Sequence, residues 1–241
     1  MNQAGAVVDR VVTDRGELVL RQCGGHFEIV SNGVFLMDTR AGTSERLLVR
    51  EALHLVRPGA RVLIGGLGVG FSLAEAVAST TPGEIVVLEI EETLIEWHRR
   101  RLAPYSGGGL HDPRVRVVNQ DLLDWLRGTD DVFDAICLDI DNGPDWTVFP
   151  PNAALYDEVG TALLRDRLAD DGVLAVWSAS ASPGYAARLA AMIGSVTTHL
   201  VDVPRGEPDV VYLARRRAPA ATGGSPGPVS RANGPGTPPA R

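Results

Sequence analysis

An apolar strand that runs into a glycine-rich turn is the feature that most constrains how this chain can fold. Residues 61–70 read R-V-L-I-G-G-L-G-V-G, and a second apolar run, V-V-L-E-I, follows at residues 86–90. Glycine lets a backbone turn sharply and approach a ligand without a Cβ in the way. The four glycines of this turn are Gly65, Gly66, Gly68 and Gly70. The layout predicts a nucleotide-type cofactor site at the head of a doubly wound α/β sheet, with Glu89 placed to accept two ribose hydroxyls.

The chain then alternates between strand and helix patterns, which predicts βαβ units and a mostly parallel sheet. Strands are expected at 61–65, 85–90, 115–118, 134–139 and 172–177. Helices are expected at 43–56, 70–79, 92–102, 121–127, 153–168 and 183–192. Two further apolar runs, 196–203 and 208–215, flank the turn P-R-G-E-P and predict a hairpin at one edge of the sheet.

Composition divides the chain into three regions. Residues 1–42 contain short apolar runs separated by D-R-G, C-G-G and S-N-G, which predicts a small antiparallel β element. Residues 43–217 hold the α/β pattern. Residues 218–241 are rich in Pro, Gly and Ala and have no apolar periodicity, so we expect a disordered tail there.

Charge and cysteine content exclude several classes of protein. The net charge of -7 argues against a surface for nucleic acid or anionic membranes. No segment has the length of a membrane span or the apolar core of a signal peptide, so a cytoplasmic protein is expected. Cys23 and Cys137 form no zinc-binding spacing, and the sequence pattern places no second ligand near His26, His54 or His98. We therefore expect no metal site.

Acidic residues follow three of the predicted strands, at the edge where a doubly wound sheet binds its ligands. These residues are Glu89, Asp121, Asp139 and Asp141. An uncompensated carboxylate at the mouth of a buried strand is costly, which favours a functional role for Asp139. The others have structural alternatives: Glu89 as a solvated residue after its strand, Asp121 as a helix N-cap, and Asp141 as part of the turn D-N-G-P.

Several other site types do not fit the sequence. The chain has no G-x-S-x-G segment, which argues against a serine hydrolase of the nucleophile-elbow type. It has no lysine, which excludes a Walker phosphate loop. The turn reads G-G-L-G-V-G-F and lacks the last glycine of G-x-G-x-x-G, so NAD binding is a minor alternative.

The order of these segments resembles the spermidine synthase family, which has the class I AdoMet-dependent transferase fold. The similarity covers roughly residues 10–215. It rests on G-G-L-G-V-G, V-L-E-I-E, D-P-R-V-R-V-V-N-Q-D, F-D-A-I-C-L-D-I-D-N-G-P, L-Y and D-G-V-L-A-V-W. The segments N-G-V-F-L-M and S-E-R-L-L-V are similar to the family's D-G-x-x-Q and D-E-x-x-Y-H-E.

The resemblance implies a role for each residue of the predicted site. The glycine turn would lie under the sulfonium end of AdoMet or decarboxylated AdoMet. Glu89 would hold the ribose hydroxyls, and Asp121 would lie near the adenine amino group. Asp139 matches the first acid of the family's catalytic D-x-x-D-P loop, and Asp141 would assist it if the second acid is displaced by one residue.

The chain departs from the family where the amine would bind. The family's glycine turn carries an aspartate where this chain has Gly68, and the glutamine of D-G-x-x-Q falls on Leu36. The family's Tyr-His pair falls on Leu48 and Val49. Its second catalytic acid falls on Asn142, and a glutamine at the end of its strand five falls on Trp177. We therefore expect a spermidine-synthase-like transferase with an altered amine site, which passes an aminopropyl or methyl group to a small-molecule acceptor such as an amine. The change at Gly68 predicts a weak or reversed preference for decarboxylated AdoMet over AdoMet.

Two alternatives stay open at this point. One is a small-molecule AdoMet-dependent methyltransferase, because Gly68 offers no acid to an aminopropyl ammonium. The other is a nucleoside-binding protein without turnover, because residues that would hold the amine are missing. Neither nucleic acid nor membrane is an expected partner, and the sequence allows a homodimer.

Overall fold

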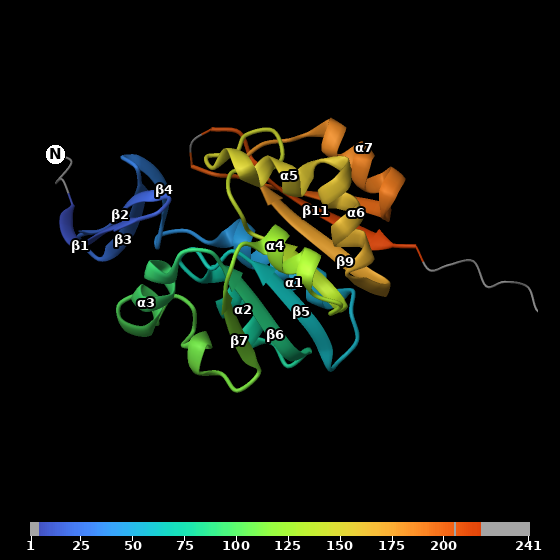
Figure 1. Ribbon diagram of the computed structural model, residues 1–241, viewed down its shortest axis with the longest axis horizontal. Coiled ribbons are helices and arrows are strands. Elements are labelled where there is room, and N and C mark those ends of the chain that lie inside the picture. The colour runs from blue at the N-terminus through green and yellow to red at the C-terminus, as the bar shows by residue number, and fades with distance from the viewer. Residues whose placement is uncertain (1–4, 205, 218–241) are drawn as a thin grey trace, which may run out of the picture.

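Two β-sheets organise the described part of the chain, residues 5–204 and 206–217 of a computed structural model (Figure 1). The disordered tail expected at 218–241 lies outside the described residues. Among the described helices, none is both long enough and apolar enough to cross a membrane.

The first sheet is an antiparallel meander of four strands in sequence order, as the N-terminal turn signals predict. Its strands are β1 Ala6–Thr13, β2 Gly16–Cys23, β3 His26–Ser31 and β4 Val34–Asp38. Leu18, Leu20 and Ile29 point from it into a shared apolar cluster with Val69 and Trp97. The sheet is therefore packed against the glycine turn and the helix that follows the second parallel strand.

The second sheet has seven strands in the order β10-β11-β9-β8-β5-β6-β7. Its strands are β5 Ala60–Gly65, β6 Pro82–Glu89, β7 Val115–Asn119, β8 Phe133–Leu138, β9 Leu168–Ser178, β10 Gly194–Val201 and β11 Asp209–Arg216. Strands β5 to β9 are parallel, and the β10–β11 hairpin pairs antiparallel at one edge. The doubly wound sheet and the edge hairpin predicted from the sequence are thus confirmed.

The strand order reverses between β5 and β8, because β6 and β7 lie on one side and β8 and β9 on the other. Gly65 pairs with Leu138, so the last residues of these two strands are neighbours. Side chains and loops that follow them diverge from this point, which opens a crevice at the carboxyl edge. The glycine turn and Asp139 therefore meet at the place where ligands bind in folds of this kind.

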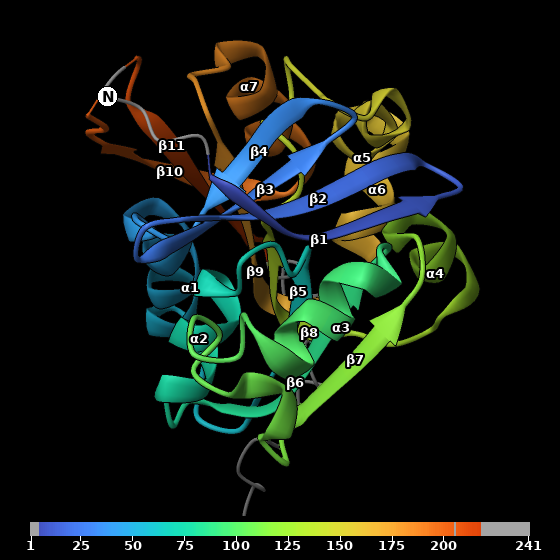
Figure 2. The same ribbon diagram turned by 90° about the vertical axis from the view of Figure 1, so that its left-hand side faces the viewer.

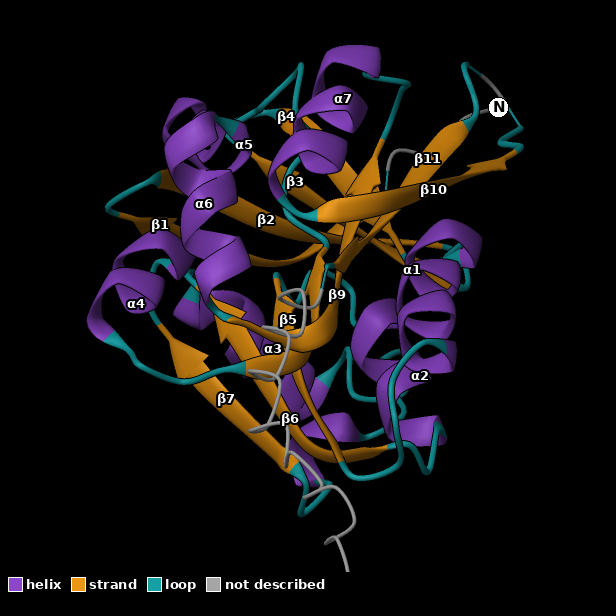
Figure 3. Cartoon of the chain, turned by 90° about the vertical axis from the view of Figure 1, so that its right-hand side faces the viewer, coloured by secondary structure: helices purple, strands orange, loops and turns teal. Residues whose placement is uncertain are grey.

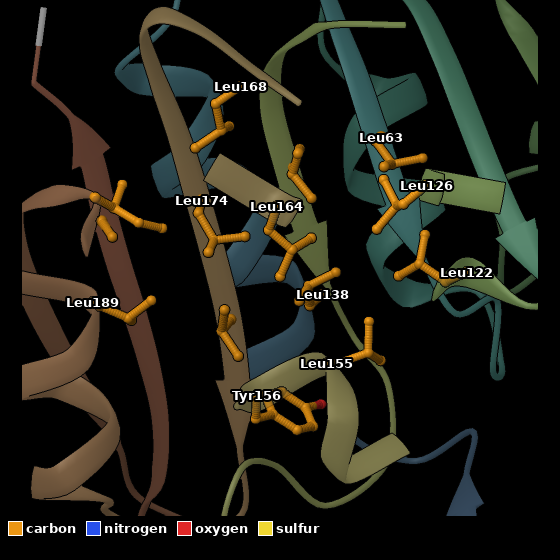
Figure 4. Packing of buried hydrophobic residues seen from close by; sticks show 14 of the residues in the cluster. Leu63, Leu122, Leu126, Leu138, Leu155, Tyr156, Leu164, Leu168, Leu174 and Leu189 are labelled. Carbon is orange, nitrogen blue, oxygen red and sulfur yellow. The ribbon is translucent and has the colours of Figure 1, made fainter. Parts of the chain in front are cut away.

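Helices cover both faces of the seven-stranded sheet (Figure 3). They are α1 Thr43–His54, α2 Phe71–Ala78, α3 Glu92–Arg100, α4 Leu122–Gly128, α5 Ala153–Tyr156, α6 Glu158–Asp166 and α7 Pro183–Met192. Helices α4 to α7 pack on one face, where Figure 4 shows leucines of β8, β9 and these helices in one layer. Helices α1, α2 and α3 supply the other face.

The helix expected over 153–168 is two helices, and this part of the prediction is wrong. The chain breaks at Asp157, whose ψ of -177° is extended, and the Asp157 carboxylate accepts a hydrogen bond from the Gly160 N–H at 2.8 Å. An aspartate that caps a new helix competes with continuation of the old one.

The N-terminal sheet lies across the carboxyl edge of the second sheet, as the view in Figure 2 shows. Besides the apolar cluster, three polar contacts join the N-terminal segment to the second sheet and α3. The Trp97 indole donates to Asp9 at 2.8 Å, and Arg15 pairs with Glu91 at 2.6 Å and donates to the Ile90 carbonyl at 2.8 Å. The first sheet therefore forms a roof over the crevice.

Candidate functional site

A cavity of about 410 Å³ lies between the carboxyl edge of the parallel strands and the N-terminal sheet. Of the predicted site residues, six line it: Gly66, Gly68, Glu89, Asp121, Asp139 and Asp141. Gly65 and Gly70 do not line it. Gly65 ends β5, and a Cβ on Gly70 would come within 2.6 Å of both His98 and Ser106, so these two glycines serve strand geometry and packing.

The glycine turn is held in shape from both sides. Gly66 has a φ of 90°, and a Cβ there would lie 2.2 Å from the Asp139 carbonyl oxygen. Behind the turn, the buried His98 ring makes a hydrogen bond of 2.9 Å through Nε2 to the Gly68 carbonyl. Burial lowers the pKa of His98 to about 4, so the ring is neutral at pH 7 and donates from Nε2.

Glu89 is buried, with an exposed fraction of 5%, which corrects the alternative of a solvated side chain. One carboxylate oxygen accepts from the Leu67 N–H at 2.9 Å and the other from the Glu91 N–H at 2.8 Å. Burial raises the pKa of Glu89, and these two hydrogen bonds oppose the rise. Each oxygen keeps a further lone pair, so Glu89 can shape the glycine turn and also accept hydroxyls.

Asp121 is the N-cap of α4 and accepts a hydrogen bond from the Asp124 N–H at 3.0 Å. The structural alternative for this residue is therefore confirmed. Its position on the cavity wall leaves the second role, contact with a base, as a compatible prediction.

Asp139 follows β8 and accepts a hydrogen bond from the Ser72 hydroxyl at 2.7 Å. Burial raises the pKa of Asp139 to about 6, and the charge of Asp209 adds to the rise while the Ser72 hydrogen bond opposes it. A carboxyl with a pKa this close to neutrality can exchange a proton at physiological pH.

Two further carboxylates, Glu45 and Asp209, lie beside Asp139 and were not predicted as site residues. Ser44 Oγ lies 2.6 Å from Asp209 and 3.0 Å from Glu45. A hydroxyl carries one hydrogen, so Ser44 can donate to one of the two carboxyl groups, and the other must be protonated to donate to Ser44. Burial and the nearby Asp139 charge raise the pKa of Glu45 to about 7, and burial also raises the pKa of Asp209.

These three carboxylates have no cationic partner among the described residues. No ion pair within the described part of the chain includes Glu45, Asp139 or Asp209. Partly buried carboxylates without a counter-charge are costly, and proton uptake is one way to reduce that cost. A bound cation is another.

Asp141 lines the cavity, but its carboxylate accepts hydrogen bonds from its own loop. It has a φ of 60° and accepts from the backbone N–H groups of Asn142 and Val148, from Phe149 N–H at 3.0 Å, and from the Asn152 amide at 2.9 Å. Four donors occupy most of the acceptor capacity of one carboxylate. Its contacts therefore fit a loop anchor better than the predicted catalytic assistant.

Methionine fills the space beside Gly68. A Cβ at this glycine would lie 2.8 Å from the Met37 sulfur, so a side chain here would require Met37 to move. Leu36 and Trp177 line the cavity, whereas Leu48 and Val49 belong to α1 and are fully buried in the core. Of the residues that differ from the family's amine site, some therefore line the cavity and others are buried in the core.

Comparison with known proteins decides the family. Residues 44–192 match the model of the spermine/spermidine synthase domain. The chain belongs to this family. The polyamine aminopropyltransferase of Mycobacterium tuberculosis is 34% identical over 198 residues, which cover 78% of this chain and 37% of that protein. The enzyme of the same name from Corynebacterium efficiens is 30% identical over 208 residues, 80% of this chain and 38% of that protein. This family member thus spans less than two-fifths of the length of these curated relatives.

Solved structures of the family share its fold. A spermidine synthase in complex with the transition-state analogue AdoDATO superposes with a TM-score of 0.73 at 20% identity, covering 89% of this chain and 75% of that one. The spermidine synthase of Thermotoga maritima gives 0.72 at 19% identity, covering 89% and 74%. The fold implied by the sequence resemblance is therefore confirmed.

Proposed function

We propose that this chain is an aminopropyltransferase that binds decarboxylated AdoMet and passes its aminopropyl group to an amine acceptor. The observation that carries the proposal is the group of three carboxylates beside the glycine turn, Glu45, Asp139 and Asp209, which have no cationic partner among residues 5–204 and 206–217. Ammonium groups are the natural counter-charge for such a group. The names of the curated relatives support the same reaction class.

The nucleoside half of the proposed site uses the residues predicted from the sequence. Glu89 would accept the ribose hydroxyls with its free lone pairs, and Asp121 would lie near the adenine. Backbone at Gly66 and Gly68 would pass under the sulfonium end, where a side chain would block the approach. The buried hydrogen bonds of Glu89 hold that carboxylate in one orientation before the ligand arrives.

In the proposed reaction, the acceptor nitrogen attacks the aminopropyl carbon that is bonded to the sulfonium sulfur. The carbon–sulfur bond breaks, its electron pair stays on sulfur, and methylthioadenosine leaves as a neutral thioether. The nitrogen must shed a proton, and Asp139 would accept it because its raised pKa of about 6 makes it a base near neutral pH. Ser72 holds one Asp139 oxygen, which orients the carboxylate.

Glu45 and Asp209 change the expected cofactor preference. Gly68 and Met37 provide no acid for the aminopropyl ammonium, but Glu45 lines the cavity and Asp209 lies next to it through Ser44, so both add negative charge on that side. Like charges repel, so AdoMet, which keeps its carboxylate, should bind less well than decarboxylated AdoMet. This replaces the weak or reversed preference expected from position 68 alone.

The second candidate is an AdoMet-dependent methyltransferase, which the Gly68 and Met37 pair favours. Calorimetric titration with AdoMet, decarboxylated AdoMet and methylthioadenosine separates the two. We expect decarboxylated AdoMet to bind roughly tenfold or more tightly than AdoMet. Asp209→Asn and Glu45→Gln should each reduce that preference, whereas Asp145→Asn, an exposed loop change, should not. Equal or tighter binding of AdoMet would favour methyl transfer.

A further inference from the structure

Three metal-ligating side chains meet on the N-terminal sheet, outside the cavity. The Cys23 sulfur, a ring nitrogen of His26 and a carboxylate oxygen of Glu28 all lie within 4.8 Å of one another. Strand alternation puts them on the face opposite Leu20 and Ile29, which point into the shared apolar cluster. None of the three lines the cavity, so this group is independent of the proposed function.

The hairpin fixes the positions of these side chains. Cys23 and His26 are direct partners in the β2–β3 ladder, joined by the two-residue turn Gly24-Gly25. Directly opposed residues hold their Cβ atoms about 4.5–5.5 Å apart. Glu28 lies two residues beyond His26 and therefore on the same face. The ladder thus holds the three ligand side chains close together without help from a metal.

The spacing between His26 and Glu28 suits coordination better than hydrogen bonding. His26 Nε2 lies 3.6 Å from Glu28 Oε1, which is too long for a hydrogen bond. That nitrogen is buried and has no hydrogen-bond partner within the described residues. Zinc bond lengths imply separations of about 3.3–3.6 Å between tetrahedral ligands. Arg21 donates to the other Glu28 oxygen at 3.0 Å, which orients Oε1 toward His26 as an outer partner of a ligand would.

We propose that Cys23, His26 and Glu28 bind one Zn²⁺, with water in the fourth position. A thiolate, an imidazole and a carboxylate form a ligand set that zinc accepts in tetrahedral geometry. The S–H bond of Cys23 is the one bond of the protein that breaks on binding, and its electron pair stays on sulfur. The thiol gives up its proton as the metal binds, so one proton is released to solvent. The bound ion would cross-link β2 and β3 and thereby stabilise the N-terminal sheet, which covers the cavity.

This site differs from the absence of metal expected from the sequence, and the reason is geometric. The spacing C-x-x-H-x-E is not one of the paired spacings that mark zinc sites in a sequence. Only the tight turn places residues 23 and 26 opposite each other, and only strand alternation adds residue 28 to the same face.

Titration of the full chain with Co²⁺, followed by Zn²⁺ displacement, tests the proposal. A thiolate ligand gives cobalt a charge-transfer band in the near ultraviolet, and we expect one equivalent to produce it. Cys23→Ser should abolish the band, and both Cys23→Ser and His26→Ala should weaken binding at least tenfold. Zn²⁺ at about a hundred times its dissociation constant should raise the melting temperature by roughly 5 °C or more.

His54→Ala is the matched control, because His54 also lies beside a glutamate, Glu51, at 3.8 Å but has no thiol partner in that pair. It should bind cobalt like the parent. Melting curves without metal establish that each variant is folded, and His26→Ala tests the site independently if Cys23→Ser is unstable. Absence of the band in the parent, or a band that persists in Cys23→Ser, would overturn the proposal.

Discussion

At the scale of single residues, Glu89 is a buried carboxylate that holds the glycine turn and also lines the cavity. The sequence places it correctly at the end of a strand, but strand patterns do not reveal that its oxygens are already bonded to Leu67 and Glu91 backbone N–H groups. Asp139 was found for a similar reason, as a carboxylate at the mouth of a buried strand. Glu45 and Asp209 were missed because each opens a secondary-structure element, where an acid has ordinary structural uses.

Replacement of Glu89 by alanine should affect stability as well as binding. The substitution leaves two N–H donors without their acceptor, so we expect the free energy of unfolding to fall by about 1–3 kcal/mol. It should also abolish methylthioadenosine binding measured by calorimetry. The control is Glu92→Ala, an exposed acid in the first turn of α3, which should change both quantities little. Unchanged binding in Glu89→Ala would remove this residue from the site.

Asp139→Asn should separate turnover from affinity. Asparagine can still accept the Ser72 hydrogen bond but cannot take up a proton at neutral pH. We expect product formation to drop by roughly 100-fold or more, with little change in the affinity for methylthioadenosine. Mass spectrometry of the product and calorimetry measure the two quantities. A variant that keeps parental turnover would show that another group accepts the proton.

At the scale of elements, the start of α1 and the residue after β8 line one side of the cavity, and the start of β11 lies next to them. Sequence patterns locate each element but not this convergence, because it depends on how α1 packs against β9 and β11. The result is a set of carboxyl groups, Glu45, Asp139 and Asp209, whose pKa values are all raised.

This convergence predicts a pH dependence of stability. The folded-state pKa of Glu45 is raised from 4.5 to about 7. The stabilisation of the folded state that this residue contributes is therefore fully present below pH 4.5 and is lost as the pH rises through about 7. His98, whose pKa is lowered to about 4, has the opposite effect on stability: its contribution is present above pH 6.5 and is lost as the pH falls toward 4. The comparison of parent with Glu45→Gln cancels that effect, because both carry His98. We expect the melting temperature of Glu45→Gln, relative to the parent, to rise between pH 5 and pH 8. A difference that stays constant would contradict the raised pKa of Glu45.

The break between α5 and α6 carries a second prediction at this scale. The apolar pattern continues across residues 153–168, so the sequence reads as one helix, and only the capping geometry of Asp157 reveals two. Asp157→Ala should lower the free energy of unfolding by about 1 kcal/mol, since it removes the acceptor for the Gly160 N–H. Asp166→Ala, an exposed acid at the other end of α6, serves as the control in denaturant titration. Equal stability of the two variants would show that the cap contributes little.

At the scale of the whole molecule, the sequence predicts the doubly wound sheet because apolar runs, turns and helices alternate regularly from residue 61 onward. It also predicts the N-terminal β element. It does not predict that this sheet covers the cavity, held there by the packing of Leu18, Leu20 and Ile29 in the shared apolar cluster. Contacts between distant segments leave no periodic signal in either segment. The position of Glu89, Asp121 and Asp139 at the cavity could therefore be predicted from strand ends, whereas the grouping of Glu45 and Asp209 with Asp139 could not.

The most direct test of the account is the product formed from each possible donor. The chain is incubated separately with decarboxylated AdoMet and with AdoMet, each with a mixture of diamines, polyamines and monoamines, and the products are identified by mass spectrometry. The account predicts an aminopropylated amine and one equivalent of methylthioadenosine from decarboxylated AdoMet, with far less product from AdoMet. A methylated amine and adenosylhomocysteine from AdoMet, or nucleoside binding with no product from either donor, would contradict it.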